Sequence, residues 1–245
     1  MQKLHVILAA AGNSRRMQKI SEMNKPYMML EGRPVLAYSL EFFEKIPYVD
    51  SVVVVASASE MDFCRREIIE KFHFKKAAAV VPGGAERQQS IFEGLKALKV
   101  LRKDVQWVAV HDGARPFLQE ELFRQMFESV QQKRAVVPGV LVKDTVKQVD
   151  DEGWVQGTPA REYLRAVQTP QLFDFDHLLK AYRMAEKDKV AATDDAMLYE
   201  KYIAPVWVQE TVWDNLKITT PQDWAWAQYR MHLQQEGKRA DRYWI

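Results

Sequence analysis

The stretch HVILAAAGNSRRM, residues 5–17, runs from a short apolar strand directly into small residues and two arginines. Apolar runs of strand-like composition recur along the chain, at 5–11, 51–57, 78–81, 107–111 and 135–142. Most are separated by stretches with helical apolar spacing and one polar side, at 34–45, 60–71, 86–99, 119–132, 176–187 and 221–233. This alternation predicts an α/β fold with a mostly parallel sheet flanked by helices, and it places ligands at the carboxyl ends of the strands.

The composition favours one domain that acts on small molecules. No Pro/Gly/Ser-rich linker or internal repeat divides the 245 residues, so we expect a single domain over 1–245. With 35 Lys and Arg against 33 Asp and Glu, the formal net charge is only +2, which excludes a general footprint for nucleic acid or a membrane surface. We therefore expect small-molecule substrates as partners, with no nucleic acid and no membrane.

The single cysteine, Cys64, indicates the compartment. One cysteine excludes an intrachain disulfide framework and a multi-cysteine zinc site, which suits a reducing, cytoplasmic location. Cys64 lies in the helix-like stretch 60–71, where we expect it to pack in the interior. The opening residues, with one basic side chain and a short apolar run that ends in glycine, are typical of a core strand and not of a signal peptide.

The segment 143–164 departs from the alternation of strands and helices. Two polar stretches lie on either side of a turn at 150–153, which predicts a protruding β-hairpin arm. An isolated two-stranded element is marginal in water unless another surface covers it. We therefore expect the arm to need a packing partner.

The small residues after the first strand predict a phosphate site. Backbone N–H groups in such a turn can surround a phosphate, and adjacent guanidiniums add charge with forked hydrogen-bond geometry. The residues of this turn are Ala10, Ala11, Gly12, Asn13, Ser14 and Arg16. The turn lacks the Gly-Lys-Ser/Thr of a P-loop and the G-x-G-x-x-G of a dinucleotide-binding fold, so those two folds lose support. Taken alone, the turn could also be a structural link with solvated arginines.

Three further segments add polar groups close to predicted strand ends. Lys25, in the turn NKPY, can reach back to the phosphate site, although a lone Lys-Pro is often only a surface turn. Paired glycines in PGGAERQQS, residues 82–90, permit the backbone to approach a flat base closely. Asp112 follows a predicted strand and can supply a hard oxygen ligand to Mg²⁺ between triphosphate oxygens. His111 beside it is more simply explained as a hydrogen-bonded core residue.

In these four segments the sequence resembles the family of 2-C-methyl-D-erythritol 4-phosphate cytidylyltransferases and the related pentitol-phosphate cytidylyltransferases. Four later segments resemble further family signatures in the family's order, at 142–147, 167–173, 193–196 and 214–223. Eight short motifs in one order are far more specific than any one of them. The resemblance implies a Rossmann-like nucleotidyltransferase fold that joins CTP to a polyol phosphate and releases pyrophosphate, in the non-mevalonate synthesis of isoprenoid precursors.

The resemblance also implies roles for individual residues. The catalytic residues would be Arg16, Lys25, Arg161 and Lys217. The CTP-binding residues would be Ala10, Ala11, Gly12, Asn13, Ser14, Arg16, Lys25, Gly84, Ala85, Arg87, Ser90, Asp112 and Gly113. The acceptor would be bound by Asp112, Arg115, Thr145, Arg161, Thr169 and Lys217. Asp112 would hold Mg²⁺ or another divalent cation. The family further implies a homodimer in which the arm is exchanged and Arg161 completes the partner's site.

Departures from the family pattern concern loop geometry. Ser14 stands in place of a second glycine, and the loop from Arg16 to Lys25 is longer than in many members, with a proline after the lysine. Gly113 replaces an alanine, and Ala85 lies where an acidic residue is frequent. None of these changes removes a charged group from the implied mechanism.

The sequence is also compatible with other functions. The acceptor could instead be ribitol phosphate or another pentitol phosphate, or a sugar 1-phosphate. A different class would be a nucleotide-binding regulator that kept the fold but is catalytically weak. A nicotinamide oxidoreductase has less support, because its phosphate-binding fingerprint is missing.

Overall fold

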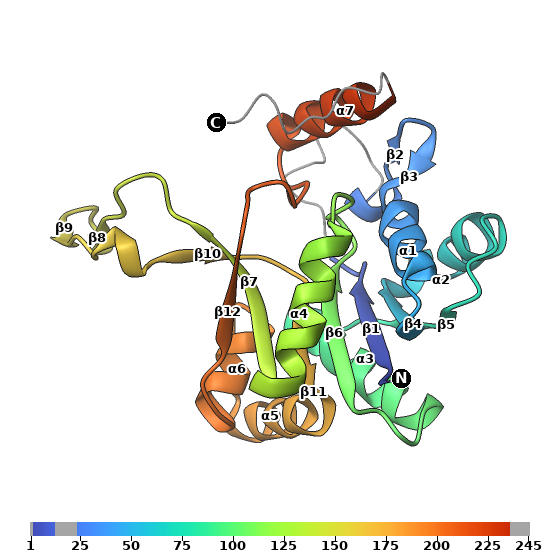
Figure 1. Cartoon of the computed structure of the whole chain (residues 1–245), viewed down its shortest axis with the longest axis horizontal. Helices are drawn as coiled ribbons and strands as arrows, with labels where there is room; N and C mark the ends of the chain where they lie inside the picture. Colours follow the sequence, from blue (N-terminus) through green and yellow to red (C-terminus); the bar gives the residue numbers. More distant parts are fainter. Residues whose placement is uncertain (1, 13–23, 236–245) are drawn as a thin grey trace.

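The computed structural model describes residues 2–12 and 24–235, so the predictions for Asn13, Ser14 and Arg16 lie outside the described residues. Within those residues the centre is an eight-stranded sheet in the order β10-β7-β11-β6-β1-β4-β5, with β12 on the other edge of β7 (Figure 1). Its strands are β1 (Leu4–Ala9), β4 (Val49–Ala56), β5 (Ala77–Pro82), β6 (Trp107–Asp112), β7 (Ala135–Leu141), β10 (Arg165–Val167), β11 (Gln171–Asp174) and β12 (Trp207–Thr211).

The sheet is parallel around β1. β4 and β6 flank β1 in the same direction, and β5 continues in that sense beside β4. β11 runs antiparallel to β6 and β7, and β10 runs antiparallel to β7. The predicted α/β sheet is therefore confirmed as mostly parallel. All five predicted strands are present, with bounds that shift by no more than two residues.

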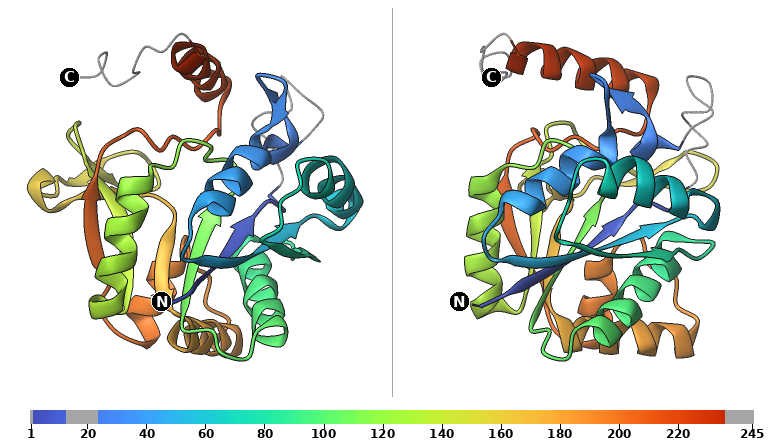
Figure 2. Two further views of the ribbon diagram at one scale, coloured as in Figure 1. Left: turned by 45° about the vertical axis from the view of Figure 1, so that its right-hand side comes forward. Right: turned by 90° about the vertical axis from the view of Figure 1, so that its right-hand side faces the viewer.

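Helices cover both faces of the sheet (Figure 2). One face carries α1 (Val35–Lys45), α2 (Met61–Phe63) and α4 (Glu120–Lys133), which pack on Leu4, Val6 and Leu8 of β1. The other face carries α3 (Arg87–Leu101), α5 (Phe175–Asp188) and α6 (Asp195–Tyr202), which pack on Ile7, Val53 and Val55. Alternate side chains of one strand point to opposite faces, so both layers share the same strands.

The predicted helix 60–71 has an unusual form. It begins as a 3-10 turn (Ala58–Glu60), passes through α2 and continues as a π-helix over Cys64–Glu70. Cys64 is fully buried in the core, and burial raises the pKa of its thiol to about 12. Its predicted role as a packing residue is confirmed.

The predicted hairpin arm is present and projects from the sheet (Figure 1). β8 (Gln148–Val149) pairs antiparallel with β9 (Val155–Gly157), and a 3-10 turn (Arg161–Tyr163) leads back to β10. Gly153 has a φ of +94°, a conformation that favours glycine, in the connecting turn. The Asp150 carboxylate accepts hydrogen bonds there from the backbone N–H groups of Glu152 and Trp154.

The last described helix, α7 (Pro221–Gln235), lies apart from the two helical layers (Figures 1 and 2). It closes a small separate core whose buried members come from several segments: Met28, Leu30, Val35, Phe117, Ile218 and Ala227. The short strands β2 (Met29–Leu30) and β3 (Arg33–Pro34) lie beside this core. Among the described helices, none is both long and apolar enough to cross a membrane.

Candidate active site

A cavity of about 450 Å³ opens at the carboxyl ends of β1, β4, β5 and β6, the edge of the sheet where the sequence predicts ligands. Predicted site residues that line it are Ala11, Gly12, Lys25, Gly84, Ala85, Arg87, Ser90, Asp112 and Lys217. Lining residues that were not assigned as site residues are Ala9, Pro26, Ser57, Ala58, Gly83, Glu86 and Ala114, although Gly83 and Glu86 belong to the segment 82–90 discussed above. Most of these residues directly follow a strand or adjoin a predicted site residue. Their position in the chain is the only feature from which they could have been predicted.

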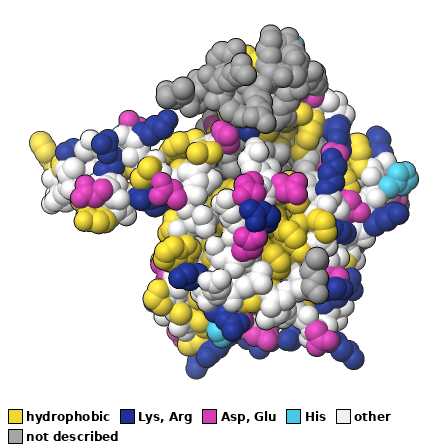
Figure 3. All heavy atoms as spheres, viewed as in Figure 1, with side chains coloured by type: hydrophobic (Ala, Val, Ile, Leu, Met, Phe, Trp, Pro, Cys, Tyr) yellow, Lys and Arg dark blue, Asp and Glu magenta, His cyan; other side chains and the backbone are white. Residues whose placement is uncertain are grey.

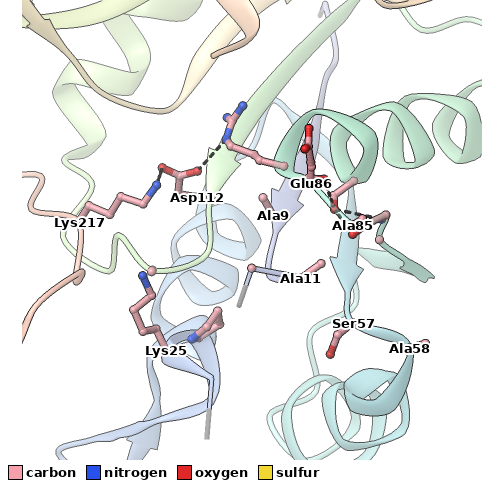
Figure 4. Close-up of a pocket in the computed structure, with 16 residues that line it drawn as sticks. Ala9, Ala11, Lys25, Ser57, Ala58, Ala85, Glu86, Asp112 and Lys217 are labelled. Carbon is pink, nitrogen blue, oxygen red and sulfur yellow. Dashed lines mark hydrogen bonds and ion pairs between the residues drawn. The ribbon is translucent and has the colours of Figure 1, made fainter. Parts of the chain in front are cut away.

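The two lysines approach the cavity from one side. Figure 4 shows Lys25 and Lys217 on that side, Ala9 and Ala11 in the middle, and Ala85 and Glu86 at the start of α3 opposite. Lys25 belongs to a 3-10 turn (Lys25–Tyr27) that Pro26 helps to start, because proline has the backbone angle of a first helical residue. The side chains that line this cavity therefore come from segments far apart in the sequence.

Asp112 is the centre of the charged groups in the cavity. Lys217 Nζ lies 2.9 Å from Asp112 Oδ2, and Arg115 Nε lies 3.3 Å from the same oxygen. Arg87 Nε lies 3.5 Å from Asp112 Oδ1. Burial alone would raise the pKa of the Asp112 carboxyl, but Lys217, Arg87 and Arg115 outweigh it and hold the pKa well below its usual range. Asp112 is therefore an anion that gathers three cations.

A chain of hydrogen bonds fixes the backbone of Asp112. Its N–H donates to Thr169 Oγ1 over 3.0 Å, and the Thr169 hydroxyl lies 3.2 Å from His111 Nδ1. His111 Nε2 lies 3.2 Å from the carbonyl oxygen of Arg115, which can only accept, so Nε2 carries the proton. Burial lowers the pKa of His111 to about 4. The predicted core role of His111 is confirmed.

The guanidinium of Arg87 is also bound by Asp195, a residue to which the sequence analysis assigned no individual role. This guanidinium donates to both carboxylate oxygens of Asp195, at 3.1 and 2.7 Å. Asp195 is fully buried and also accepts a hydrogen bond from the Tyr182 hydroxyl. Burial opposes the charge on Arg87, but the carboxylates of Asp195 and Asp112 raise its pKa. The segment 193–196 stood out as a family signature, yet nothing in it indicates a partner in α3.

The glycine-rich loop before α3 is locked by its own helix. The N–H of Gly84 donates to Ser90 Oγ and the N–H of Ala85 donates to Gln89 Oε1, at 3.1 and 2.9 Å. A Cβ on Gly83 would lie 2.5 Å from the Cβ of Ala11 and 2.7 Å from Ser90 Oγ. This loop therefore packs directly against the end of β1, and the N–H groups of Gly84 and Ala85 donate within the chain.

Gly113 stands at another close approach. A Cβ there would lie 2.8 Å from Leu36 Cδ1 and 3.0 Å from the backbone oxygen of Ala9. The Gly113 N–H donates to that same oxygen over 2.8 Å, which ties the end of β6 to the end of β1. Glycine in place of the family's alanine thus suits this tight contact.

Two residues predicted to bind the acceptor make internal contacts instead of lining the cavity among the described residues. Thr169 is buried and orients Asp112, as described above. Arg115 is also buried, and its Nη1 donates to the carbonyl oxygen of Asn215 over 2.8 Å. The side-chain amide of Asn215 in turn donates to the carbonyl oxygen of Thr169 over 2.6 Å. Both predicted residues therefore support the loop that carries Lys217.

The arm residues lie outside the cavity. Thr145 and Arg161 are not among the described residues that line it. Arg161 is exposed, and its Nη1 donates to the carbonyl oxygen of Lys143 over 2.6 Å at the base of the arm. A single chain therefore does not bring these two residues to its own cavity.

The described lining residues suit a cation that is shared with a bound nucleotide. Across residues 2–12 and 24–235, no three His, Cys, Asp or Glu side chains are grouped to form a metal site. Asp112 and Glu86 are the carboxylates among the described lining residues. Mg²⁺ in nucleotide sites is commonly held by one or two carboxylates together with substrate phosphates, and this chain fits that pattern.

Comparison with known proteins points to one family. The family model described as 2-C-methyl-D-erythritol 4-phosphate cytidylyltransferase matches residues 4–233. The enzyme of that name from Clostridium acetobutylicum is 40% identical over 217 residues, covering 89% of this chain and 92% of that protein. The enzyme of the same name from Caldanaerobacter subterraneus is 39% identical over 217 residues, covering 89% and 93%.

Solved structures point the same way. The 4-diphosphocytidyl-2C-methyl-D-erythritol synthase of Anaerococcus prevotii superposes with a TM-score of 0.81 at 32% identity, covering 94% of this chain and 96% of that chain. The 2-C-methyl-D-erythritol 4-phosphate cytidylyltransferase of Thermus thermophilus superposes with a TM-score of 0.75 at 29% identity, covering 94% and 100%.

Proposed function

Because this chain belongs to the family of 2-C-methyl-D-erythritol 4-phosphate cytidylyltransferases, we propose that it transfers the cytidylyl group of CTP to 2-C-methyl-D-erythritol 4-phosphate. The products are CDP-methylerythritol and pyrophosphate, in the synthesis of isoprenoid precursors. The chain is thus a nucleotidyltransferase.

The reaction is a single displacement at phosphorus. An oxygen of the acceptor's phosphate attacks the α-phosphorus of CTP and forms the new P–O bond. The bond from the α-phosphorus to the oxygen that bridges to the β-phosphorus breaks, and that oxygen leaves with pyrophosphate. The substrates supply both nucleophile and leaving group, so the protein contributes position and charge.

The charge balance of the cavity is the observation that carries this proposal. Lys25, Arg87 and Lys217 line it together, against the carboxylates of Glu86 and Asp112. The acceptor's phosphate dianion and the triphosphate of CTP repel each other. Cations that are already in position before the substrates bind reduce that repulsion. Three cations against two carboxylates leave only a small positive surplus, but the cations are already held in place at the cavity, which suits two phosphorylated substrates.

We assign the residues to roles as follows. Lys25, together with Arg16, stabilises charge around the α-phosphorus, and Lys217 aims the acceptor phosphate. CTP lies between the end of β1 and the loop before α3, along Ala10, Ala11, Gly12, Asn13, Ser14, Gly84, Ala85, Arg87, Ser90 and Gly113. Arg115 and Thr169 act on the acceptor side by holding Asp112 and the Lys217 loop in place. Thr145 and Arg161 contact the acceptor from the arm.

A divalent cation belongs to the proposed reaction as well. Asp112 would hold Mg²⁺ or a similar ion beside the triphosphate, with Glu86 as the other carboxylate nearby. When bound, the ion neutralises phosphate charge. Lys217 would then exchange its contact with Asp112 for the acceptor phosphate.

We further propose a homodimer with exchanged arms. Along the arm, the large apolar side chains of Val149, Trp154, Val155 and Tyr163 are exposed in the single chain, and Figure 3 shows hydrophobic and charged side chains side by side there. A twofold partner can cover such a face and receive Arg161. We also propose that residues 1–245 act as one nucleotidyltransferase domain in the cytoplasm, a compartment that suits a single buried cysteine.

The nucleotide preference tests the proposed function. Purified protein is incubated with 2-C-methyl-D-erythritol 4-phosphate, Mg²⁺ and either CTP, UTP or GTP, with pyrophosphate release and product mass as readouts. CTP should exceed the others in kcat/KM by a large factor, because a wrong base leaves buried polar groups unsatisfied. Equal use of CTP and UTP would contradict cytidylyl transfer, and binding of CTP without pyrophosphate release would favour a nucleotide-binding regulator.

A further inference from the structure

Arg230 is a buried cation on α7, the helix outside the two main layers. Its side chain is 3% exposed. The guanidinium lies over the rings of Phe117 and Trp226, 4.7 and 5.2 Å from their centres, and the two rings meet edge to face. A buried charge is costly without compensating contacts, and the attraction of the cation to two aromatic rings supplies part of that compensation.

Arg230 also makes a directed hydrogen bond to the loop that carries Lys217. Its Nη1 donates to the carbonyl oxygen of Asp214 over 2.6 Å and lies 3.7 Å from Asp214 Oδ1. Asp214 precedes Lys217 by three residues, and this segment enters the cavity wall beside Asp112 (Figure 4). The side chain of Arg230 therefore reaches from α7 to the start of the Lys217 loop.

The same loop is also held by the segment that follows β6. Arg115 donates to the carbonyl oxygen of Asn215, and the Ile218 N–H donates to the carbonyl oxygen of Ala114 over 2.9 Å. Consecutive carbonyl groups, those of Asp214 and Asn215, are thus each held by a buried guanidinium. One guanidinium comes from the loop after β6 and the other from α7.

Apolar packing by itself would not fix this loop. Ile218 and Ala227 are buried in the small outer core, with Trp224 and Trp226 packed against it, so burial of apolar area docks α7 on the body. The hydrophobic effect does not depend on the orientation of the buried groups. A hydrogen bond to a carbonyl oxygen, in contrast, restrains both the donor–acceptor distance and the angle at the hydrogen. Arg230 can therefore determine where the loop lies once the helix has docked.

We propose that Arg230 is a positioning residue for the transfer reaction. Through the carbonyl of Asp214 it sets the place of the Lys217 ammonium at Asp112 and toward the acceptor phosphate. This inference rests on the proposed function and adds a residue outside the cavity to it.

The test compares three variants on the same helix. Arg230→Met removes the guanidinium but keeps an apolar chain of similar length, and Gln228→Met, at an exposed position, is the matched control. Arg230→Lys keeps the charge but lacks the planar guanidinium with its fixed array of N–H donors. Arg230→Met should lower kcat about 10- to 100-fold, the scale of a small misplacement of a reacting group, with the KM for CTP within about threefold. Arg230→Lys should fall between it and wild type, and Gln228→Met should match wild type.

A double-mutant cycle separates positioning from a general loss of structure. If Arg230 acts through Lys217, Arg230→Met should cause no further loss of kcat in a Lys217→Ala background. Full additivity of the two losses, or normal kcat in a folded Arg230→Met or Arg230→Lys chain, would overturn the inference. A wild-type chain that releases no pyrophosphate would contradict the proposed function instead, so the two failures are distinct.

Discussion

At the scale of single residues, the described site converges on Asp112. Three cations contact its carboxylate, and its backbone is fixed through Thr169. Lys217 is proposed to aim the acceptor phosphate and Lys25 to stabilise charge at the α-phosphorus. Removing either side chain should therefore lower the reaction rate more than it disturbs the fold. The two lysines are the direct probes of this arrangement.

Lys25→Ala and Lys217→Ala should each lower kcat by about a hundredfold or more, typical of removing one electrostatic donor from a transition state. Both side chains lie at the cavity surface, so the chain should stay folded, with a lower thermal midpoint of unfolding for Lys217→Ala because Asp112 loses one of its three cations. Steady-state kinetics and a melting curve check this, with the exposed Lys103→Ala as the control. Near-normal turnover in either cavity variant would remove that lysine from the mechanism.

Cys64 gives a second prediction at this scale. Since burial raises the pKa of its thiol to about 12, the reactive thiolate is scarce at pH 8 and the side chain is also shielded. A thiol reagent should therefore label the folded chain very slowly and the urea-unfolded chain at the rate of a free cysteine. Fast labelling of the folded chain would mean that Cys64 is accessible and available for redox chemistry.

The sequence pointed to Lys25 and Asp112 because each lies in a turn or at a strand end with a recognisable pattern, whereas Lys217 was assigned only through the family resemblance. It did not find Asp195, whose contact with Arg87 spans 108 positions of sequence. The resemblance assigned Arg115 and Thr169 to the acceptor, and it gave no sign of the hydrogen bonds that both residues make within the chain. Partners of this kind depend on how distant helices and loops meet, which no local pattern encodes.

At the scale of elements, periodicity predicted the long strands and helices and missed the short ones. β10, β11 and β12 have three to five residues with polar positions, so they carry little apolar alternation. The arm was predictable because its turn is rich in turn-forming residues. The π-helical form of Cys64–Glu70 was not, since its apolar spacing resembles that of an α-helix.

The loop before α3 provides a test at this scale. Gly83→Ala should push the loop away from Ala11 and raise the KM for CTP about tenfold or more, because the cavity wall shifts. Gly94→Ala is the matched control inside α3, where a Cβ would lie 2.7 Å from Ile7 Cγ2. It should lower the free energy of unfolding by about 1–3 kcal/mol through overpacking but leave the KM unchanged. An unchanged KM in Gly83→Ala would place CTP elsewhere.

At the scale of the whole molecule, the arm leaves one chain without two of its proposed acceptor contacts. Thr145 and Arg161 belong to an arm that extends away from the sheet (Figure 1), while Lys25 and Lys217 line a cavity within the body. A twofold dimer that exchanges arms would unite the two sets of residues.

Subunit mixing tests the exchange. Arg161→Ala and Lys217→Ala chains should each be strongly impaired, but a statistical mixture should regain about a quarter of its sites, since half the dimers are mixed and each has one intact site. Lys25→Ala mixed with Lys217→Ala is the control and should regain nothing, because both lysines come from one chain. No recovery despite proven exchange, or a fully active monomer, would rule out the shared site.

Competition between two acceptors tests whether the chain is specific for 2-C-methyl-D-erythritol 4-phosphate. The chain is given CTP and Mg²⁺ with equal amounts of 2-C-methyl-D-erythritol 4-phosphate and ribitol 5-phosphate, and the CDP-linked products are separated by mass. Their ratio equals the ratio of the two kcat/KM values. We predict that CDP-methylerythritol dominates and forms one-to-one with pyrophosphate. A mixture dominated by CDP-ribitol, or one with neither product, would contradict the account.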